Sequence, residues 1–130
     1  MLEPGQFELN EAWLVFQLNE APVSTEADGD FNVVCLMEAA SLYILAIEFV
    51  PTQEPVADQV AVGLLEKGRF KGRTLPQQLL ISSGLDFNSF KVHAKRLGIE
   101  FVLQPEDTLL PFTSEAKEGF KAHSGGDGVP

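Results

Sequence analysis

Two adjacent serines, Ser82 and Ser83, follow an apolar run at 79–81 and precede Gly84. The run predicts a buried strand, and the glycine predicts a tight turn into the next helix. In α/β sheets, chemistry is placed at the carboxyl ends of strands, so the two serines mark a candidate cleft. A serine hydroxyl there could act as a nucleophile, although the Gly-x-Ser-x-Gly frame of a nucleophile elbow is missing.

A serine nucleophile also needs a base, and the sequence offers two histidines, His93 and His123. His93 falls beside the apolar stripe of a predicted helix, a position typical of a partly packed histidine. We therefore assign no catalytic residue and interpret the serines as residues that shape the turn. An enzyme with an unrecognised site near Ser82, Ser83 and Gly84 remains an alternative.

The apolar patterns predict five strands and three helices that would position this turn. Residues 12–18 form a nearly continuous apolar run, which predicts a central strand covered on both faces. The runs at 31–38 and 42–50 are closely spaced, which predicts an antiparallel hairpin. Helices are predicted at 55–67, 87–97 and 114–122, and the last two strands at 79–81 and 99–103.

The connections follow from proline, glycine and charged residues. Residues 19–30 carry a proline, a glycine and four carboxylates, which predicts a solvated loop. Gly68 is predicted to end the first helix and to begin a basic loop at 68–74, and Asp86 is predicted to cap the second helix. Because both faces of the hairpin strands are mostly apolar, we expect helices to cover the sheet on its two sides.

Three strands followed by helix, strand, helix, strand and helix is the element order of the ribonuclease H-like fold. We therefore expect an α/β domain with a mixed five-stranded sheet, a central first strand and helices on both faces. Within this fold the chain resembles integrase and transposase cores. Residues 31–50 resemble their second and third strands, the run 80–84 leading to Phe90 resembles their Asp-Asn-Gly turn, and residues 96–100 resemble their Leu-Gly-Ile entry to the next strand. Residues 72–111 also resemble bacterial domains of unknown function, which implies a fold without an activity.

The resemblance implies two divalent metal ions held by carboxylates from the first strand, the fourth strand's tip and a later helix. Here the first strand offers Phe16 and Gln17, and the fourth offers Ser82. The last predicted helix keeps Glu115 and Glu118, so Glu115 joins Ser82 and Ser83 in the candidate cleft. Because hard cations need charged oxygen ligands, a hydroxyl cannot replace a carboxylate. We expect no metal and no cofactor.

Charge divides the chain into two halves. From Met1 to Glu66 there are twelve acidic residues and no lysine or arginine, whereas the rest has nine basic and seven acidic residues. A weak nucleic-acid-binding module is therefore an alternative; it would use Arg69, Lys71, Arg73, Lys91, Lys95 and Arg96. The net charge of −10 makes nucleic acid an unfavourable partner overall, because its affinity comes mostly from phosphate contacts. Glu38 is one of several acids at element ends whose spacing does not require a metal.

Length and composition predict one α/β domain at 1–123 and a disordered tail at 124–130. No apolar run could span a bilayer and no secretory segment opens the chain, so we expect a cytoplasmic protein without membrane contact. The single cysteine, Cys35, is predicted to be a small core residue. We expect a non-catalytic domain that acts through protein contacts, with self-association as an open alternative.

Overall fold

The computed structural model describes residues 2–27, 29–72 and 74–122. Its strands are β1 (Ala12–Gln17), β2 (Val23–Thr25), β3 (Gly29–Glu38), β4 (Ile44–Pro51), β5 (Gln78–Ser82) and β6 (Glu100–Gln104). Its helices are α1 (Asp58–Gly72), α2 (Asn88–Arg96) and α3 (Glu106–Phe120), after a short 3₁₀ turn at Pro4–Gln6. The predicted tail at 124–130 lies outside the described residues. Among those residues, no helix has the length and apolarity needed to cross a membrane.

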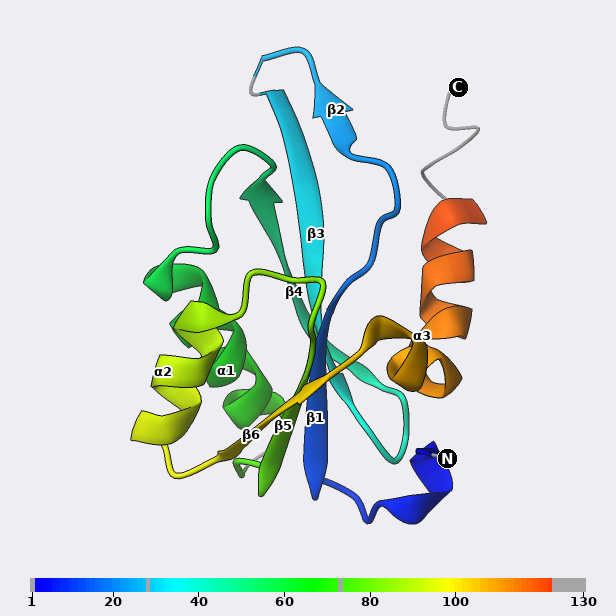
Figure 1. Cartoon of the computed structure of the whole chain (residues 1–130), viewed down its shortest axis with the longest axis vertical. Coiled ribbons are helices and arrows are strands. Elements are labelled where there is room, and N and C mark those ends of the chain that lie inside the picture. The colour runs from blue at the N-terminus through cyan, green and yellow to red at the C-terminus, as the bar shows by residue number, and fades with distance from the viewer. Residues whose placement is uncertain (1, 28, 73, 123–130) are drawn as a thin grey trace.

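A mixed sheet forms the middle layer of the molecule (Figure 1). Its strand order is β2-β3-β1-β5-β6, and β4 pairs with β3. Strand β1 is antiparallel to β3 and parallel to β5, and β5 is parallel to β6. The predicted central position of the first strand and the change from antiparallel to parallel pairing are therefore confirmed.

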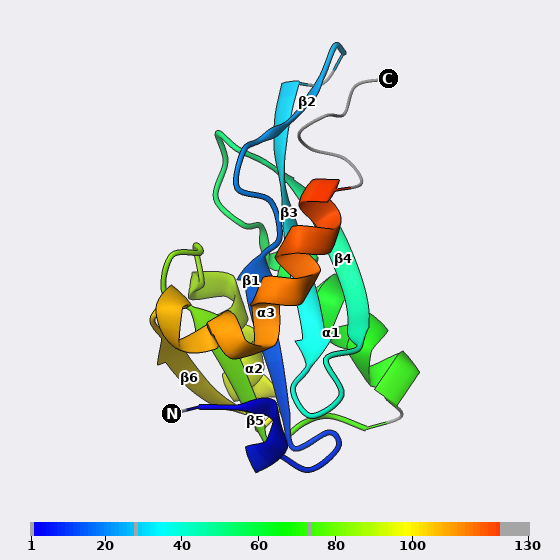
Figure 2. The same ribbon diagram turned by 90° about the vertical axis from the view of Figure 1, so that its right-hand side faces the viewer.

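The alternating side chains of β1 enter two separate cores. Trp13 and Val15 pack beneath α1 and α2, whereas Leu14 and Phe16 pack beneath α3 on the opposite face. Figures 1 and 2 show the helices on these two sides of the sheet. The prediction of helices on both faces is confirmed, because a strand buried on two sides needs two covering layers.

Cys35 belongs to the core under α3 and is fully buried. Burial raises the pKa of its thiol to about 12, because the charged thiolate is poorly solvated there. The thiol is therefore neutral at ordinary pH, and the prediction of a core cysteine is confirmed.

Within the described part of the chain the sheet has six strands, so the prediction of five is wrong at residues 19–30. Val23 pairs with Phe31, and the short strand β2 adds to β3 through a turn that enters β3 at Gly29, where φ is +86°. A three-residue strand is too short to give a readable alternation in the sequence. The preceding Asn19 is also buried, and its side-chain oxygen accepts a hydrogen bond of 2.7 Å from the Val33 N–H.

Helix α1 does not end at Gly68, so the predicted basic loop is mostly helical. Gly68 is buried, and a Cβ atom at this position would lie 2.6 Å from Leu36 and 2.8 Å from Trp13. The glycine therefore allows close packing of α1 on the sheet rather than ending the helix. Arg69 and Lys71 lie on α1, and Arg73 lies outside the described residues.

The other two helices also begin differently from the prediction. Asp86 does not cap α2; its carboxylate accepts a hydrogen bond of 2.9 Å from the Val56 N–H and so joins the segments that precede α1 and α2. Helix α3 begins at Glu106 and continues through Pro111. Burial of Leu109 and Phe112 offsets the cost of roughly 3 kcal/mol that a proline brings to a helix interior.

Among the residues that the structure describes, strand β4 is covered on one side only, which contradicts the expectation that helices cover both of its faces. Leu45 and Val50 are buried, whereas Ile47 is 39% and Phe49 is 55% exposed. Helix α1 packs on β4 from one side, and α3 packs on the middle of the other face. Part of the apolar surface of β4 is thus left uncovered by the described residues.

Candidate functional site

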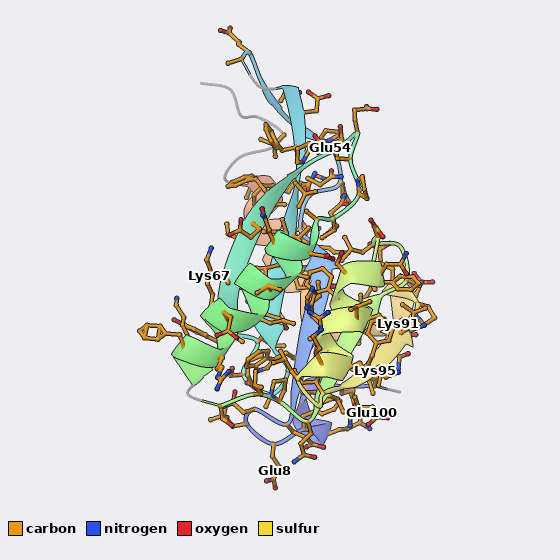
Figure 3. The ribbon with its side chains drawn as sticks, turned by 90° about the vertical axis from the view of Figure 1, so that its left-hand side faces the viewer. Glu8, Glu54, Lys67, Lys91, Lys95 and Glu100 are labelled. Carbon is orange, nitrogen blue, oxygen red and sulfur yellow. The ribbon has the colours of Figure 1, made fainter. Side chains whose placement is uncertain are left out.

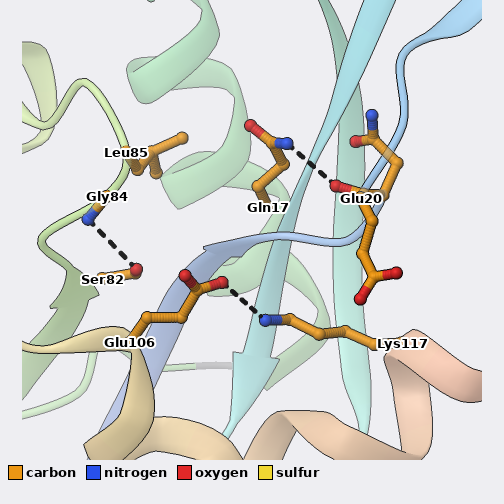
Figure 4. A pocket seen from close by; sticks show the side chains of 8 residues that line it. Gln17, Glu20, Ser82, Gly84, Leu85, Glu106 and Lys117 are labelled. Carbon is orange, nitrogen blue, oxygen red and sulfur yellow. Dashed lines mark hydrogen bonds and ion pairs between the residues drawn. The ribbon is translucent and has the colours of Figure 1, made fainter.

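The carboxyl ends of β1 and β5 open into a polar cleft beside the start of α3 (Figure 4). Its volume is about 430 Å³. Eight residues line it: Gln17, Asn19, Glu20, Ser82, Gly84, Leu85, Glu106 and Lys117. The cleft therefore lies at the strand ends where the sequence predicted it, although most of its lining residues were not in the prediction.

The two predicted serines have different surroundings. Ser82 is the last residue of β5 and is 4% exposed, and its hydroxyl oxygen accepts a hydrogen bond of 3.4 Å from the Gly84 N–H. Ser83 is exposed, and its backbone N–H donates to the Gln104 carbonyl at 2.8 Å. Ser82 lines the cleft and Ser83 does not. Their backbone and hydroxyl groups hold the turn.

The β1 side of the cleft is formed by amides. The Gln17 side-chain N–H donates to the Asn19 carbonyl at 2.8 Å. Asn19 in turn donates to the Ala21 carbonyl and to the Asn32 side chain. Both amides are thus used to hold the chain where it leaves β1, and neither carries a charge.

An ion pair within α3 forms the third side of the cleft. The Lys117 Nζ lies 2.8 Å from a carboxylate oxygen of Glu106. The Lys117 side chain is 17% exposed and that of Glu106 is 58% exposed, so the ammonium is the more enclosed partner. Figure 4 shows the two side chains pointing toward each other across the mouth of the cleft, near Ser82.

Glu115, which the sequence grouped with the serines, lies away from them. Along α3 it follows Glu106 by nine residues, and at about 100° per residue this places it on the opposite side of the helix. Lys117 follows Glu106 by eleven residues and returns to the same side. Glu115 lines a different hollow, together with Leu2 and Pro111.

His93 is not near the serines either. It is buried on α2, and its Nε2 atom lies 3.8 Å from Asp58 and has no hydrogen-bond partner among the described residues. Asp58 instead accepts a hydrogen bond of 3.0 Å from the Ser89 hydroxyl. His93 lines a separate small hollow between α1 and α2, so it supplies no base to Ser82.

The cations named for nucleic-acid binding lie on two helices. Figure 3 shows Lys91 and Lys95 on the side of α2 away from α1, and Lys67 on the side of α1 away from α2. Lys71 lies one turn after Lys67 and shares its side. Arg69 lies 3.7 Å from Glu66 of its own helix. Lys71 therefore lies on one side of the layer formed by α1 and α2, and Lys91 and Lys95 lie on the other. Arg96 lines the small hollow between the two helices.

Comparison with known proteins gives structural neighbours only. No model of a protein family matches the chain, and no curated protein matches its sequence. The chain is similar to the catalytic core domain of BIV integrase, with a TM-score of 0.52, 19% identity, and 85% of this chain and 63% of that chain covered. It is also similar to the HTLV-2 integrase catalytic core in complex with magnesium, with a TM-score of 0.54, 10% identity, and 88% and 68% covered.

A third neighbour is a chain in the structure of the simian T-cell lymphotropic virus intasome in complex with PP2A regulatory subunit B56 gamma. Its TM-score is 0.58 and its identity 12%, and the match covers 93% of this chain. This chain spans 44% of that neighbour and 63% of the BIV integrase core. At these identities the similarity concerns the fold.

The residues of the cleft do not fit a pair of magnesium ions. Among the residues that the structure describes, no three carboxylate, histidine or cysteine side chains are grouped so that they could hold a metal ion. Glu106 is neutralised by Lys117, and the exposed Glu20 carboxylate lies 4.0 Å from the Lys121 ammonium. An ammonium group inside the cleft repels a divalent cation. The chain thus has the ribonuclease H-like fold of integrase catalytic cores, and Gln17 and Ser82 line the cleft at the ends of β1 and β5.

Proposed function

We propose that this chain is a ribonuclease H-like domain that acts by binding other proteins and does not catalyse two-metal phosphoryl transfer. The observation that carries the proposal is the composition of the cleft. Gln17 and Ser82 are neutral, and the carboxylate of Glu106 is already paired with Lys117. Two-metal catalysis needs several carboxylates to hold two cations close together. This cleft offers two carboxylates, Glu20 and Glu106, together with the ammonium of Lys117.

A role in protein binding is supported by the apolar surface that the described residues leave uncovered. Aromatic side chains are among the strongest anchors of protein interfaces. Here several large apolar side chains of β4, of the residue before it and of the neighbouring end of α1 are exposed: Tyr43, Ile44, Ile47, Phe49 and Phe70. Phe70 is 82% exposed. Large exposed apolar patches are typical of interaction sites.

The catalytic part of the proposal is tested by titrating the protein with Mg²⁺ and Mn²⁺ and by assaying nuclease and strand-transfer activity. We expect no metal-dependent turnover and no saturable metal binding by calorimetry. The variants Glu106→Gln and Glu115→Gln serve as matched controls for the two acidic positions of α3. Turnover that requires the metal and is lost in either variant would contradict the proposal. DNA binding that weakens steeply with salt would favour the nucleic-acid alternative.

A further inference from the structure

Strand β4 has an unpaired edge. Among the residues described, it pairs with β3 alone. The Thr52 N–H donates to the Asp30 carbonyl at 3.0 Å, which fixes the phase of this antiparallel ladder. Because backbone groups alternate along such a ladder, Ile47 and Phe49 direct their N–H and C=O groups away from β3.

The side chains of the same two residues extend the core under α3 to the edge of the sheet. Ile47 is opposite Cys35 and Phe49 is opposite Val33, and both partners belong to that core. Figure 2 shows β4 beside α3 rather than beneath it. An added strand would therefore find both unpaired backbone groups and an uncovered apolar surface.

The free length of this edge is limited at both ends. At one end the register shifts between Leu36 and Met37, so that Leu45 is skipped in the pairing and forms a bulge. At the other end Pro51 has no N–H to donate. Bulges and prolines are the usual means of blocking an edge strand, and here they leave residues 46–50 available.

Positive charge borders the edge on the α1 side. The Lys67 ammonium is paired with the Glu48 carboxylate of β4. The Lys71 ammonium lies 5.8 Å from the centre of the Tyr43 ring and has no carboxylate partner among the residues described. Together with Leu18, Phe70 and β4, these lysines line a shallow hollow of about 520 Å³. An ammonium group without an acidic partner favours a ligand carboxylate at this position. This local attraction acts against the repulsion that the net charge of −10 exerts on an acidic ligand as a whole.

A second copy of this chain does not fit the edge well. A symmetric antiparallel pairing that uses both Ile47 and Phe49 is centred on Glu48. It would place the two Glu48 residues directly opposite each other, about 4.5 Å apart at Cα, and like charges in that position are destabilising. A pairing centred on Ile47 would have to include the bulge at Leu45, which interrupts the regular ladder. A pairing centred on Phe49 would have to include Pro51, which has no N–H to donate.

We propose that the edge formed by residues 46–50 of β4 binds an extended segment of another protein, in which acidic residues alternate with apolar ones. The segment adds to the sheet as a seventh strand: its backbone pairs with Ile47 and Phe49. Its apolar side chains cover the exposed face, and its carboxylates meet Lys71. This inference names the surface and the partner class of the protein-binding role proposed above, and it rests on that role.

The test uses a blocked synthetic peptide of about nine residues in which valine and glutamate alternate. Backbone amide signals of the ¹⁵N-labelled chain are followed by NMR up to about 1 mM peptide. We expect the largest shifts at Ile47 and Phe49 and slowed hydrogen exchange of these two amides. A valine–lysine peptide of the same pattern should bind at least about tenfold more weakly, and so should a valine–glutamate peptide with its residues in two blocks.

Substitutions on the protein test each element of the proposal. Ile47→Pro removes an outward N–H without removing a bond to β3, and we expect at least about tenfold weaker binding. Ile47→Val is its matched control and should bind normally. Phe49→Lys places a charge on the edge and should also weaken peptide binding. It replaces Ile47→Pro in the test if the proline variant does not fold. Lys71→Gln should reduce the preference for the glutamate peptide over the lysine peptide.

Three results would overturn the proposal: no shifts at about 1 mM peptide, shifts centred elsewhere, or equal binding by Ile47→Pro and Ile47→Val. Dimerisation of the free chain through β4 would assign the edge to a second copy instead. These outcomes are distinct from a failure of the proposed function. Metal-dependent turnover would contradict that function whether or not β4 binds the peptide, and an inert domain with an unreactive edge would contradict the β4 assignment alone.

Discussion

The two ends of the central strand β1 each hold a carboxylate, and their surroundings differ. At the end where β1 begins, Glu38 is 3% exposed and lies opposite Trp13. At the end where β1 finishes, Glu106 is 58% exposed at its side chain and has one ammonium partner, Lys117. One carboxylate is part of the structure of a turn, whereas the other belongs to an open cleft.

Glu38 receives hydrogen bonds from four donors in the turn and in the chain that enters β1. The backbone N–H groups of Asn10, Ala40 and Ser41 donate to it at 2.9, 3.1 and 2.7 Å, and the Ser41 hydroxyl donates at 2.6 Å. Burial by itself raises the pKa of Glu38, but these hydrogen bonds outweigh it and hold the pKa below its usual value. The charge is therefore stabilised by fixed backbone groups.

The difference shows what an acidic residue at a strand end can indicate. Fixed N–H donors make the Glu38 carboxylate a structural element that no ligand needs to complete. Glu106 is held by a flexible lysine side chain, and such an exposed pair contributes little to stability. The side chains of Glu106 and Lys117 can therefore rearrange around a ligand, whereas the hydrogen bonds of Glu38 are fixed by the backbone.

The largest effect is expected for Glu38→Gln. The amide cannot accept all four hydrogen bonds, so partly buried N–H groups lose their partners, and we expect a loss of about 2–3 kcal/mol in the free energy of unfolding. Urea denaturation at neutral pH measures it. The matched control Glu48→Gln removes one exposed ion pair and should cost under about 1 kcal/mol. Equal costs for the two variants would contradict the structural role of Glu38.

The stability difference between the wild type and Glu38→Gln should also depend on pH. Because the pKa of Glu38 is lowered by folding, its contribution to stability is present above its unfolded value of about 4.5 and is lost as the pH falls through the folded value. The stability difference between the wild type and Glu38→Gln should thus be constant near neutral pH and shrink below about pH 4.5. A difference that grew on acidification would contradict this sign.

A smaller effect is expected when a carboxylate is returned to the cleft by Ser82→Asp. The new side chain would be buried near Glu106, because both Ser82 Oγ and a Glu106 oxygen lie within 3.9 Å of the Cβ position above Gly84. Its pKa should be raised, which costs about 1–2 kcal/mol at neutral pH and less as the pH falls through the raised value. Thermal unfolding against the neutral control Ser82→Asn measures it.

The same variant tests the metal chemistry of the cleft. When Ser82→Asp is combined with Lys117→Gln, which removes the ammonium, millimolar Mn²⁺ should raise the melting temperature, and it should leave the wild type and Ser82→Asn unchanged. A wild type that is itself stabilised by Mn²⁺ would contradict the proposal that its cleft holds no metal.

The sequence was most informative where one local pattern decided the structure. The continuous apolar run at 12–18 predicted a central strand, because only a strand covered on both faces needs such a run. The position of Ser82 at a strand end followed in the same way. The prediction that Gly68 ends a helix was wrong. The glycine is needed because Trp13, from a distant part of the chain, packs closely against α1 at this position.

The cleft was less predictable, because its α3 side depends on where that helix begins. Pro111 suggested a start at Ser114, which hid Glu106 and made Glu115 the nearest acidic candidate. The acidic pair Glu106 and Asp107 directly after Pro105 was the signal that could have revealed the true start, since acids are favoured in the first helical turn. An error in the start of a helix changes which of its residues face the sheet.

The smallest effect is expected for Lys117→Gln, which removes the ammonium from the cleft. Glu106 is mostly exposed, so water replaces the lost partner. The free energy of unfolding should therefore fall by at most about 1 kcal/mol relative to the wild type. Chemical denaturation beside Lys121→Gln, a lysine whose distance to Glu20 is 4.0 Å, provides the control. A loss as large as that of Glu38→Gln would mean that the ion pair holds α3 on the sheet, and that the cleft is as structural as the opposite end of β1.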